Sequence, residues 1–374
     1  MNLFHRDHKV RYAVVGLGWI AQESVLPAFT HADKNSRLVA LVTDNHGKAA
    51  QLGQQYNVDH VISYDEYDDF LKRGQVDAVY IALPNNMHRD FTIRTARAHV
   101  HILCEKPMAD TVSECQDMIR ACEQNGVKLM IAYRLHFDPA NLRAISVVNS
   151  GQIGEPRIFN SVFTQQVEGG NIRLKKSLGG GPLMDMGVYC INAARYLFRA
   201  EPQEVIAAGA NDGEPRFNEV HEMASAVLRF PGERLATFTC SFGAQAVDAY
   251  EVIGTKGSIR LRPAYTYHGK MKLSYTDSEN KQQEHSFGEH DQFGAELLYF
   301  SQCLLDDKDP EPGGREGMAD LRVVEALLQS MRSRQAVKLD PYDVPSRPDE
   351  RQKIELRPVK PPETVEVESP SGKT

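Results

Sequence analysis

Val14-Val15-Gly16-Leu17-Gly18-Trp19-Ile20-Ala21 is the stretch that decides the fold. It follows a short apolar run and opens a helical pattern that continues to Phe29. A glycine-rich turn between a buried strand and a helix lets backbone N–H groups meet a pyrophosphate at the helix N-terminus. Ala21 stands where the usual motif has its third glycine, a replacement that this packing position tolerates. The motif alone is weak, but its context predicts dinucleotide binding rather than an ordinary tight turn.

The residues around this turn alternate between expected strands and helices up to about residue 135. We expect apolar strands at 11–15, 38–42, 76–83, 99–104 and 128–132. We expect helices at 21–31, 48–56 and 88–98, and a fourth helix that opens on a capping box of Thr111 and Glu114 and closes near Asn125-Gly126. Apolar strands that lack alternation and are joined by helices predict a Rossmann-like, doubly wound parallel sheet, with both faces covered.

The pattern changes after about residue 155 to consecutive strands with short turns. Strands are expected at 157–163, 204–210, 224–230, 234–241, 249–253, 258–261 and 272–275, and helices at 183–198, 293–305 and 318–332. Short connections predict an open, mostly antiparallel sheet. So few helices cover one face only, which predicts that the other face binds a second copy in a homodimer or homotetramer.

The whole chain is therefore expected to combine an α/β and an α+β unit. The predicted parts are an NADP-binding Rossmann domain at 1–135, a substrate-binding and oligomerisation domain at 136–345, and a Pro- and Glu-rich tail at 346–374. We expect the tail to be mobile or to lie over a neighbouring subunit.

Composition excludes several classes of partner. The formal net charge is −7, which offers no global basic field to nucleic acid. No apolar run approaches the roughly 20 residues that span a bilayer, and residues 1–9 lack the apolar core of a secretory signal. Six cysteines without a Cys-x-x-Cys pair predict reduced thiols in a cytoplasmic protein. The histidines do not show the spacing of a zinc site. His99 and His101 are expected to point the same way along a strand, but they lack nearby ligand partners. No metal is therefore expected.

Cys104-Glu105-Lys106-Pro107-Met108-Ala109 follows the expected strand 99–104, the fourth in the predicted order. Ligands of open parallel sheets bind at the carboxyl ends of the strands, so Lys106 is well placed to reach a cofactor or substrate. Pro107 restricts Lys106 to an extended conformation. The alternative from the residues alone is a solvated lysine at a strand end.

Three glycines at 179–181 precede a helix that carries Asp185 and Tyr189. Residues four apart share a helix face, so the acid and the phenol form a candidate acid/base pair at a close-approach loop. Asn192 and Tyr196 are expected to extend the same polar face. An ordinary amphipathic helix with an acid in its first turn explains the residues equally well.

Taken together, these three motifs resemble the glucose–fructose oxidoreductase and inositol dehydrogenase family, also called Gfo/Idh/MocA. The resemblance runs from about residue 10 to 340, and it is strongest to the glucose–fructose oxidoreductase branch, which has tyrosine at the position of Tyr189. Residues 130–139, Met-Ile-Ala-Tyr-Arg-Leu-His-Phe-Asp-Pro, also look like that branch. The chain departs from the periplasmic glucose–fructose enzyme in its N-terminus, which shows no export signal.

The resemblance implies a sugar oxidoreductase that transfers hydride between a nicotinamide and C1, or a ring carbon, of an aldose. Tyr189 would act as the acid/base group, assisted by Lys106 and Asp185, because a cation near a phenol favours its phenolate. Pro84-Asn85 resembles the cofactor-lining loop of the family. The other residues implied in cofactor binding are Leu83, His88, Glu105 and, as weaker candidates for sugar or nicotinamide contacts, Arg134, His136 and Arg173.

The choice of dinucleotide depends on residues 43–48. NAD-selective sites place an acid at the end of the second strand, against the ribose hydroxyls. In the resembled branch a small hydroxyl residue and a lysine stand there for a 2′-phosphate, and Thr43 and Lys48 match them, which favours NADP over NAD. Asp44 complicates this, since it could bind ribose or merely cap the next helix.

Two other functions remain open from the sequence. The same fold serves non-catalytic regulators that bind a dinucleotide and a sugar, although such proteins tend to lose the lysine and the tyrosine that are present here. The fold also serves oxidoreductases of non-sugar substrates such as a trans-dihydrodiol.

Overall fold

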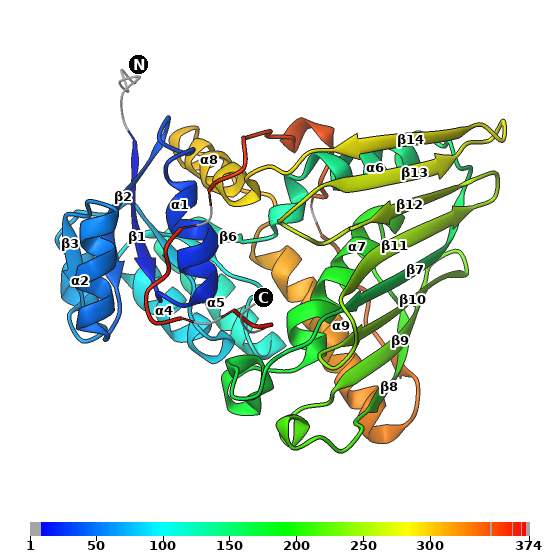
Figure 1. The fold of residues 1–374 in the computed structure, drawn as a ribbon, viewed down its shortest axis with the longest axis horizontal. Coiled ribbons are helices and arrows are strands. Elements are labelled where there is room, and N and C mark those ends of the chain that lie inside the picture. The colour runs from blue at the N-terminus through cyan, green and yellow to red at the C-terminus, as the bar shows by residue number, and fades with distance from the viewer. Residues whose placement is uncertain (1–8, 345, 361, 368, 372–374) are drawn as a thin grey trace.

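The computed structural model describes residues 9–344, 346–360, 362–367 and 369–371, and it contains two sheets that lie side by side (Figure 1). Residues 1–8, which include most of the N-terminal segment considered above, lie outside the described residues. Among the described residues we find no helix with the length and apolar character needed to cross a bilayer.

The first sheet is parallel throughout and has the order β3-β2-β1-β4-β5-β6. Its strands are β1 (Val10–Val15), β2 (Ser36–Val42), β3 (His60–Ile62), β4 (Ala78–Ile81), β5 (His101–Cys104) and β6 (Leu129–Ile131). The strand order changes direction at β1, which confirms the predicted doubly wound architecture. The central strands are buried along most of their length, because their apolar side chains pack on both faces.

Apart from α3, the helices around the first sheet follow the expected pattern. They are the π-turn segment η1 (Ala21–Val25), α1 (Leu26–Ala28), α2 (His46–Gln55), α3 (Tyr67–Leu71), α4 (Asn85–Arg97) and α5 (Val112–Asn125). The capping box of Thr111 and Glu114 opens α5, and Gly126 closes it in the left-handed conformation.

The second sheet has nine strands in the order β14-β13-β12-β11-β7-β10-β9-β8-β15. Its strands are β7 (Pro156–Thr164), β8 (Glu204–Ala210), β9 (Met223–Phe230), β10 (Arg234–Ser241), β11 (Val247–Gly254), β12 (Ser258–Arg262), β13 (Met271–Thr276), β14 (Gln282–Phe287) and β15 (Val337–Lys338). Among the described strand pairs of this second sheet, only β7–β10 is parallel, so the predicted mostly antiparallel sheet is confirmed.

Four longer helices complete the second half of the chain: α6 (Pro139–Asn149), α7 (Val188–Phe198), α8 (Gln292–Leu305) and α9 (Gly314–Ser333). The short segment η5 (Leu183–Gly187) leads directly into α7. Helices α6, α7 and α9 pack against one face of the second sheet, whereas α8 packs against β1 and β2 of the first sheet (Figure 1). The opposite face of the second sheet carries exposed apolar side chains, among them Ile158, Val227 and Leu235.

The described part of the C-terminal tail packs on the chain's own first domain, since Ile354 and Val365 contact the N-terminal apolar cluster. The expectation that the tail is mobile or lies over a neighbouring subunit stays a prediction. The side chain of Gln22, which is 1% exposed, donates to the carbonyl oxygen of Val365 at 3.0 Å and accepts from its N–H at 2.7 Å. The predicted domain limits at residues 135 and 345 stay predictions.

Several elements were missed or misplaced from the sequence. Strands β3, β14 and β15 and helices α3 and α6 were not expected, so the strand that carries the Lys106 loop is the fifth along the chain and not the fourth. His99 lies in a left-handed turn (φ 57°) ahead of β5, so the prediction that it shares a strand with His101 is wrong. Short or half-exposed strands carry no clear period-2 pattern, because only a few of their side chains face a core.

Candidate active site

A cavity of about 760 Å³ lies between the two sheets. Gly16, Thr43, Ala82, Glu105 and Ala132 line it, and they follow the carboxyl ends of β1, β2, β4, β5 and β6. The other wall comes from η5, α7 and the loops of the second sheet. The cavity therefore occupies the edge at which open parallel sheets bind their ligands.

The glycine turn forms one end of this cavity. Gly16 has φ +89°, and a Cβ at this position would collide with the carbonyl oxygen of Ala82. Gly18, Trp19 and Ile20 line the same end, ahead of the helical segment that starts near Ala21. A close backbone approach at a helix N-terminus fits the pyrophosphate of a dinucleotide.

Thr43 and Lys48 line the cavity beyond the glycine turn, at the start of α2. Asn45 caps α2 by accepting from the N–H of Lys48 at 3.0 Å, so the suggestion that Asp44 caps this helix is wrong. Asp44 instead accepts from the N–H of Tyr64 at 2.8 Å. The Thr43 hydroxyl and the Lys48 ammonium thus line the cavity, whereas the Asp44 carboxylate binds the backbone of the loop after β3.

Lys106, Asp185 and Arg173 form a linked group in the cavity. Asp185 accepts from Lys106 Nζ through Oδ1 at 3.2 Å and from Arg173 Nε through Oδ2 at 2.9 Å. Burial alone would raise the pKa of Asp185, but Arg173 and Lys106 outweigh burial and hold it well below its usual value. Burial alone would lower the pKa of Lys106, but Tyr189 and Asp185 outweigh it and raise this pKa. Both groups are therefore charged at neutral pH.

Tyr189 lies one turn beyond Asp185 and faces the same cavity, as the spacing predicted. Lys106 Nζ is 4.7 Å from the centre of the Tyr189 ring, and Phe163 packs edge-on against the ring at 5.6 Å. The phenol oxygen accepts from Arg134 Nη2 at 3.2 Å. Arg134 was expected only as a weak candidate for ligand contacts, and its contact with Tyr189 was not foreseen.

Glu105 lies beside Lys106 and is almost fully buried. Its carboxylate accepts from Tyr80 Oη at 2.8 Å and from the backbone N–H of Lys106 at 3.2 Å. Burial raises the pKa of Glu105, against the opposing charge of Lys106. Its side chain thus fixes the loop that presents Lys106.

The predicted cofactor loop meets the glycine loop of the second half. Leu83, Pro84 and Asn85 line the cavity, and the Asn85 amide donates to the carbonyl oxygen of Gly179 at 2.8 Å. Gly180 packs so tightly that a Cβ would collide with the carbonyl oxygen of Arg173. The Asn85 hydrogen bond joins the start of the Asp185 segment to the first domain, and the Gly180 contact packs it against the Arg173 segment.

Some predicted site residues lie away from the cavity. His88 is fully buried, with its ring nitrogens on the carbonyl oxygens of Leu83 and Pro107 at 2.9 and 3.0 Å, so its predicted cofactor contact is wrong. His136 is buried against Glu311 and Asn192, so it is wrong as a ligand contact as well. Asn192 and Tyr196 turn into the buried core behind Tyr189, not along the cavity.

Other lining residues were missed from the sequence. Tyr64 comes from the loop after β3 of the first sheet. The others come from strands and loops of the second half, from α8 and from the tail: Thr164, Gln165, Ile172, Asp248, Arg262, Tyr265, Thr266, Tyr267, Phe293 and Pro370. Their positions depend on how the two sheets pack together, and a local pattern carries no signal for that.

Comparisons with known proteins agree with this geometry. Residues 10–133 match the model of an oxidoreductase family with an NAD-binding Rossmann fold. Residues 141–260 match the GFO/IDH/MocA C-terminal domain.

Individual relatives match most of the chain. The D-xylose 1-dehydrogenase (NADP(+)) of Haloarcula marismortui is 32% identical over 340 residues, which cover 89% of this chain and 94% of that protein. The crystal structure of aldose-aldose oxidoreductase from Caulobacter crescentus complexed with glycerol superposes with a TM-score of 0.85 at 37% identity, covering 89% of this chain and all of that one. The trans-1,2-dihydrobenzene-1,2-diol dehydrogenase of Danio rerio is 28% identical over 258 residues, 69% of this chain and 75% of that protein.

Proposed function

The chain belongs to the Gfo/Idh/MocA oxidoreductase family, and from this premise we propose that it transfers hydride between a nicotinamide dinucleotide and C1 of an aldose. It is an NAD(P)-dependent oxidoreductase of CH–OH groups, and its relatives include an NADP-dependent xylose dehydrogenase and an aldose-aldose oxidoreductase. The observation that carries the proposal is the meeting of Lys106, Asp185 and Tyr189 in a cavity whose other end is the glycine turn.

The residues present fit a bound dinucleotide. Gly16, Gly18, Trp19 and Ile20 would hold its pyrophosphate, and Leu83, Pro84 and Asn85 would line its middle. Thr43 and Lys48 would face a 2′-phosphate, and Glu105, Arg134 and Arg173 border the end at which Lys106 and Tyr189 lie. When bound, the nicotinamide supplies the acceptor or donor of the hydride.

Tyr189 and the side chains around it accept and return the proton of the reacting hydroxyl. In oxidation the phenolate of Tyr189 takes the O1 proton as the C1–H bond breaks and the carbonyl forms. In reduction Tyr189 returns that proton as a general acid. Lys106 supplies positive charge beside the developing alkoxide, and Asp185 orients Lys106 while its remaining lone pairs accept from a sugar hydroxyl.

A substrate panel tests the proposed function. Purified protein is mixed with NADP(H) or NAD(H) and with pentoses, hexoses or the corresponding lactones, and nicotinamide absorbance is followed. We expect aldose-dependent formation of the reduced cofactor, and sugar-dependent reoxidation when a lactone or a second aldose is added. Absence of any sugar-dependent signal with both cofactors would contradict the proposal.

A non-sugar substrate is the second candidate, because a trans-dihydrodiol dehydrogenase is among the relatives. Tyr189 could act as the acid/base group for a hydroxyl of a trans-dihydrodiol in the same way as for a sugar hydroxyl. Adding a trans-1,2-dihydrodiol to the same panel separates the two: a kcat/KM above that of every aldose would favour this alternative.

We expect NADP to be preferred over NAD, since Lys48 lies at the start of α2 in the cavity. Replacing Lys48 with alanine removes a charged partner of the 2′-phosphate, an interaction worth about 1.5–3 kcal/mol. The KM for NADP should rise roughly 10- to 100-fold while the KM for NAD changes little. Lys72→Ala, on an exposed surface, is the control. An equal rise for both cofactors would refute the assignment of Lys48.

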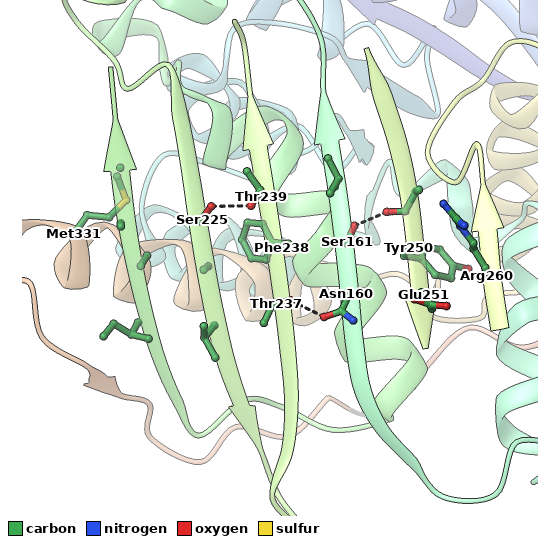
Figure 2. A pocket seen from close by; sticks show the side chains of 18 of the residues that line it. Asn160, Ser161, Ser225, Thr237, Phe238, Thr239, Tyr250, Glu251, Arg260 and Met331 are labelled. Carbon is green, nitrogen blue, oxygen red and sulfur yellow. Dashed lines mark hydrogen bonds between the residues drawn. The ribbon is translucent and has the colours of Figure 1, made fainter. Parts of the chain in front are cut away.

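The chain is also proposed to form a homodimer or homotetramer through the open face of the second sheet, defined by Ile158, Val162, Ile206, Val227 and Leu235. These side chains are 38–43% exposed and lie on four adjacent strands. Figure 2 shows neighbouring strands of this face, on which the Asn160–Thr237 and Ser225–Thr239 hydrogen bonds cross between strands. A broad apolar surface of this kind matches a second copy of itself.

A charge in the middle of this face should break the assembly. Val227→Glu would place a buried carboxylate against the partner, so light scattering after size exclusion should change from an oligomer to a monomer with an unchanged circular dichroism spectrum. Val61→Glu is the matched control, because Val61 is equally exposed (40%) but lies on the edge strand β3 of the first sheet. A monomeric wild-type protein, or a Val227→Glu oligomer, would overturn the proposed interface.

A further inference from the structure

The phenol oxygen of Tyr189 contacts a cation that the Lys106 scheme does not use. Arg134 Nη2 donates to this oxygen at 3.2 Å, and the guanidinium carbon lies 5.1 Å from the Tyr189 ring centre. Lys106 Nζ instead lies over the ring and donates to Asp185, through Oδ1 at 3.2 Å and through the backbone carbonyl at 3.3 Å. Arg134 thus contacts the phenol oxygen of Tyr189, whereas Lys106 lies over its ring.

The guanidinium of Arg134 is held firmly in this position. Arg134 opens the short segment η2 (Arg134–His136) directly after β6 and is 4% exposed. It donates to the carbonyl oxygens of Tyr265 and Thr266 and to Gln292 Oε1. The Gln292 amide is fixed in turn by Asp138 Oδ2 at 3.2 Å and by the Thr266 carbonyl oxygen at 3.1 Å. Three acceptors therefore fix the donor that meets Tyr189.

We propose that Arg134 is the positioning residue that orients the Tyr189 hydroxyl and favours its phenolate; this rests on the proposed function. A guanidinium has donors and no acceptor, so Tyr189 can only accept from Arg134. The phenol's own proton must then point away from Arg134, towards the cavity. A guanidinium also keeps its charge at every working pH, so it stabilises the phenolate without exchanging a proton.

The other charged and titratable groups around Tyr189 come from every element packed against it. They are Lys106 after β5, Arg173 in η3 (Ile172–Leu174), Asp185 in η5, and Tyr265 and Tyr267 in the loop after β12. Asp185 offsets the charges of Lys106 and Arg173, because its two oxygens bind one each. Arg134 donates its hydrogen bonds to neutral carbonyl and amide oxygens. Two buried acids, Glu105 after β5 and Glu296 on α8, also act on its charge, but burial raises the pKa of both carboxyls and so disfavours their charged forms. The positive charge of Arg134 is therefore left to act on the phenol.

The pH dependence of Arg134 variants tests this proposal. Oxidation requires the phenolate, so the rate rises with pH as the phenolate forms. In Arg134→Gln this rise should move up by about one pH unit or more, lowering kcat near pH 7 at least tenfold and restoring it at higher pH. Arg134→Lys should fall between Arg134→Gln and the wild type. A loss of kcat that is equal at all pH values, or a rise confined to the KM of the cofactor, would overturn the proposal.

A spectroscopic titration separates this proposal from the proposed function. The ultraviolet signal of phenolate formation is recorded against pH without substrate, and subtracting the Tyr189→Phe curve isolates Tyr189. Removing Arg134 should move this isolated transition to higher pH even if no aldose proves to be a substrate. An unmoved transition would refute the role of Arg134, whereas a missing response to sugars would refute only the proposed function. Circular dichroism confirms that each variant is folded.

Discussion

Replacing Tyr189 with phenylalanine should lower kcat/KM for aldose oxidation about 100- to 10,000-fold, the usual contribution of a general acid/base group. The change removes one oxygen and leaves a ring that still packs against Phe163 and under Lys106. Dinucleotide binding should stay within about twofold of the wild type, since the glycine turn and Lys48 are untouched. Steady-state kinetics and titration of nicotinamide fluorescence measure the two effects.

The control for this variant is the same change at Tyr275, on β13, where the phenol donates to Gln283 at 2.6 Å. Tyr275→Phe removes a hydroxyl from the second sheet without touching a residue of the cavity, so its activity should match the wild type. Tyr189→Phe turnover within about threefold of the wild type would contradict the acid/base role. A parallel loss of cofactor binding would point to a folding defect instead.

Replacing Arg195 with methionine should lower the free energy of unfolding by about 3–5 kcal/mol, the cost of removing one partner from a buried ion pair. Arg195 is 0% exposed and binds Glu316 at 2.8 Å, Asp320 at 2.5 Å and Glu201 at 2.7 Å. Methionine fills much of the volume but leaves Glu316 and Asp320 without their cation, whereas Glu201 keeps its pair with Arg347 at 2.6 Å. Denaturant unfolding followed by circular dichroism measures the loss.

Arg37→Met provides the contrast, because Arg37 pairs with Asp59 on an exposed surface and such pairs contribute about 0–1 kcal/mol. An Arg195→Met variant that unfolds within about 1 kcal/mol of the wild type would contradict this argument. Arg195 lies on α7, the helix of Tyr189, and Asn192 of the same helix donates to Glu316 at 3.0 Å and to Asp320 at 2.9 Å on α9. The buried ion pairs that stabilise the site helix therefore lie one to two turns beyond the reacting phenol.

The site was predictable where its residues carry local signals. Residue 16 has a positive φ and lies close to Ala82, and glycine is the residue that best tolerates both conditions. The glycine is therefore visible in the sequence as a local signal. The spacing of Asp185 and Tyr189 placed both on one helix face, and the position of Lys106 after an apolar strand placed it at the ligand edge of the sheet. The same logic failed for His88 and His136, because a polar side chain beside a site motif can equally well satisfy buried backbone or side-chain groups.

The sequence by itself determined the two-part architecture, the glycine turn and the helix that pairs Asp185 with Tyr189, because strand runs, helix caps and i,i+4 spacing act over a few residues. Only the tertiary structure decided that Arg134 meets Tyr189, 55 residues away, and that Gln292, 158 residues away, holds the guanidinium there. It also decided that the tail lies on the chain's own first domain through Gln22 and Val365. Such contacts depend on the packing of whole sheets and helices, whose geometry is set by the burial of the entire core rather than by any local pattern.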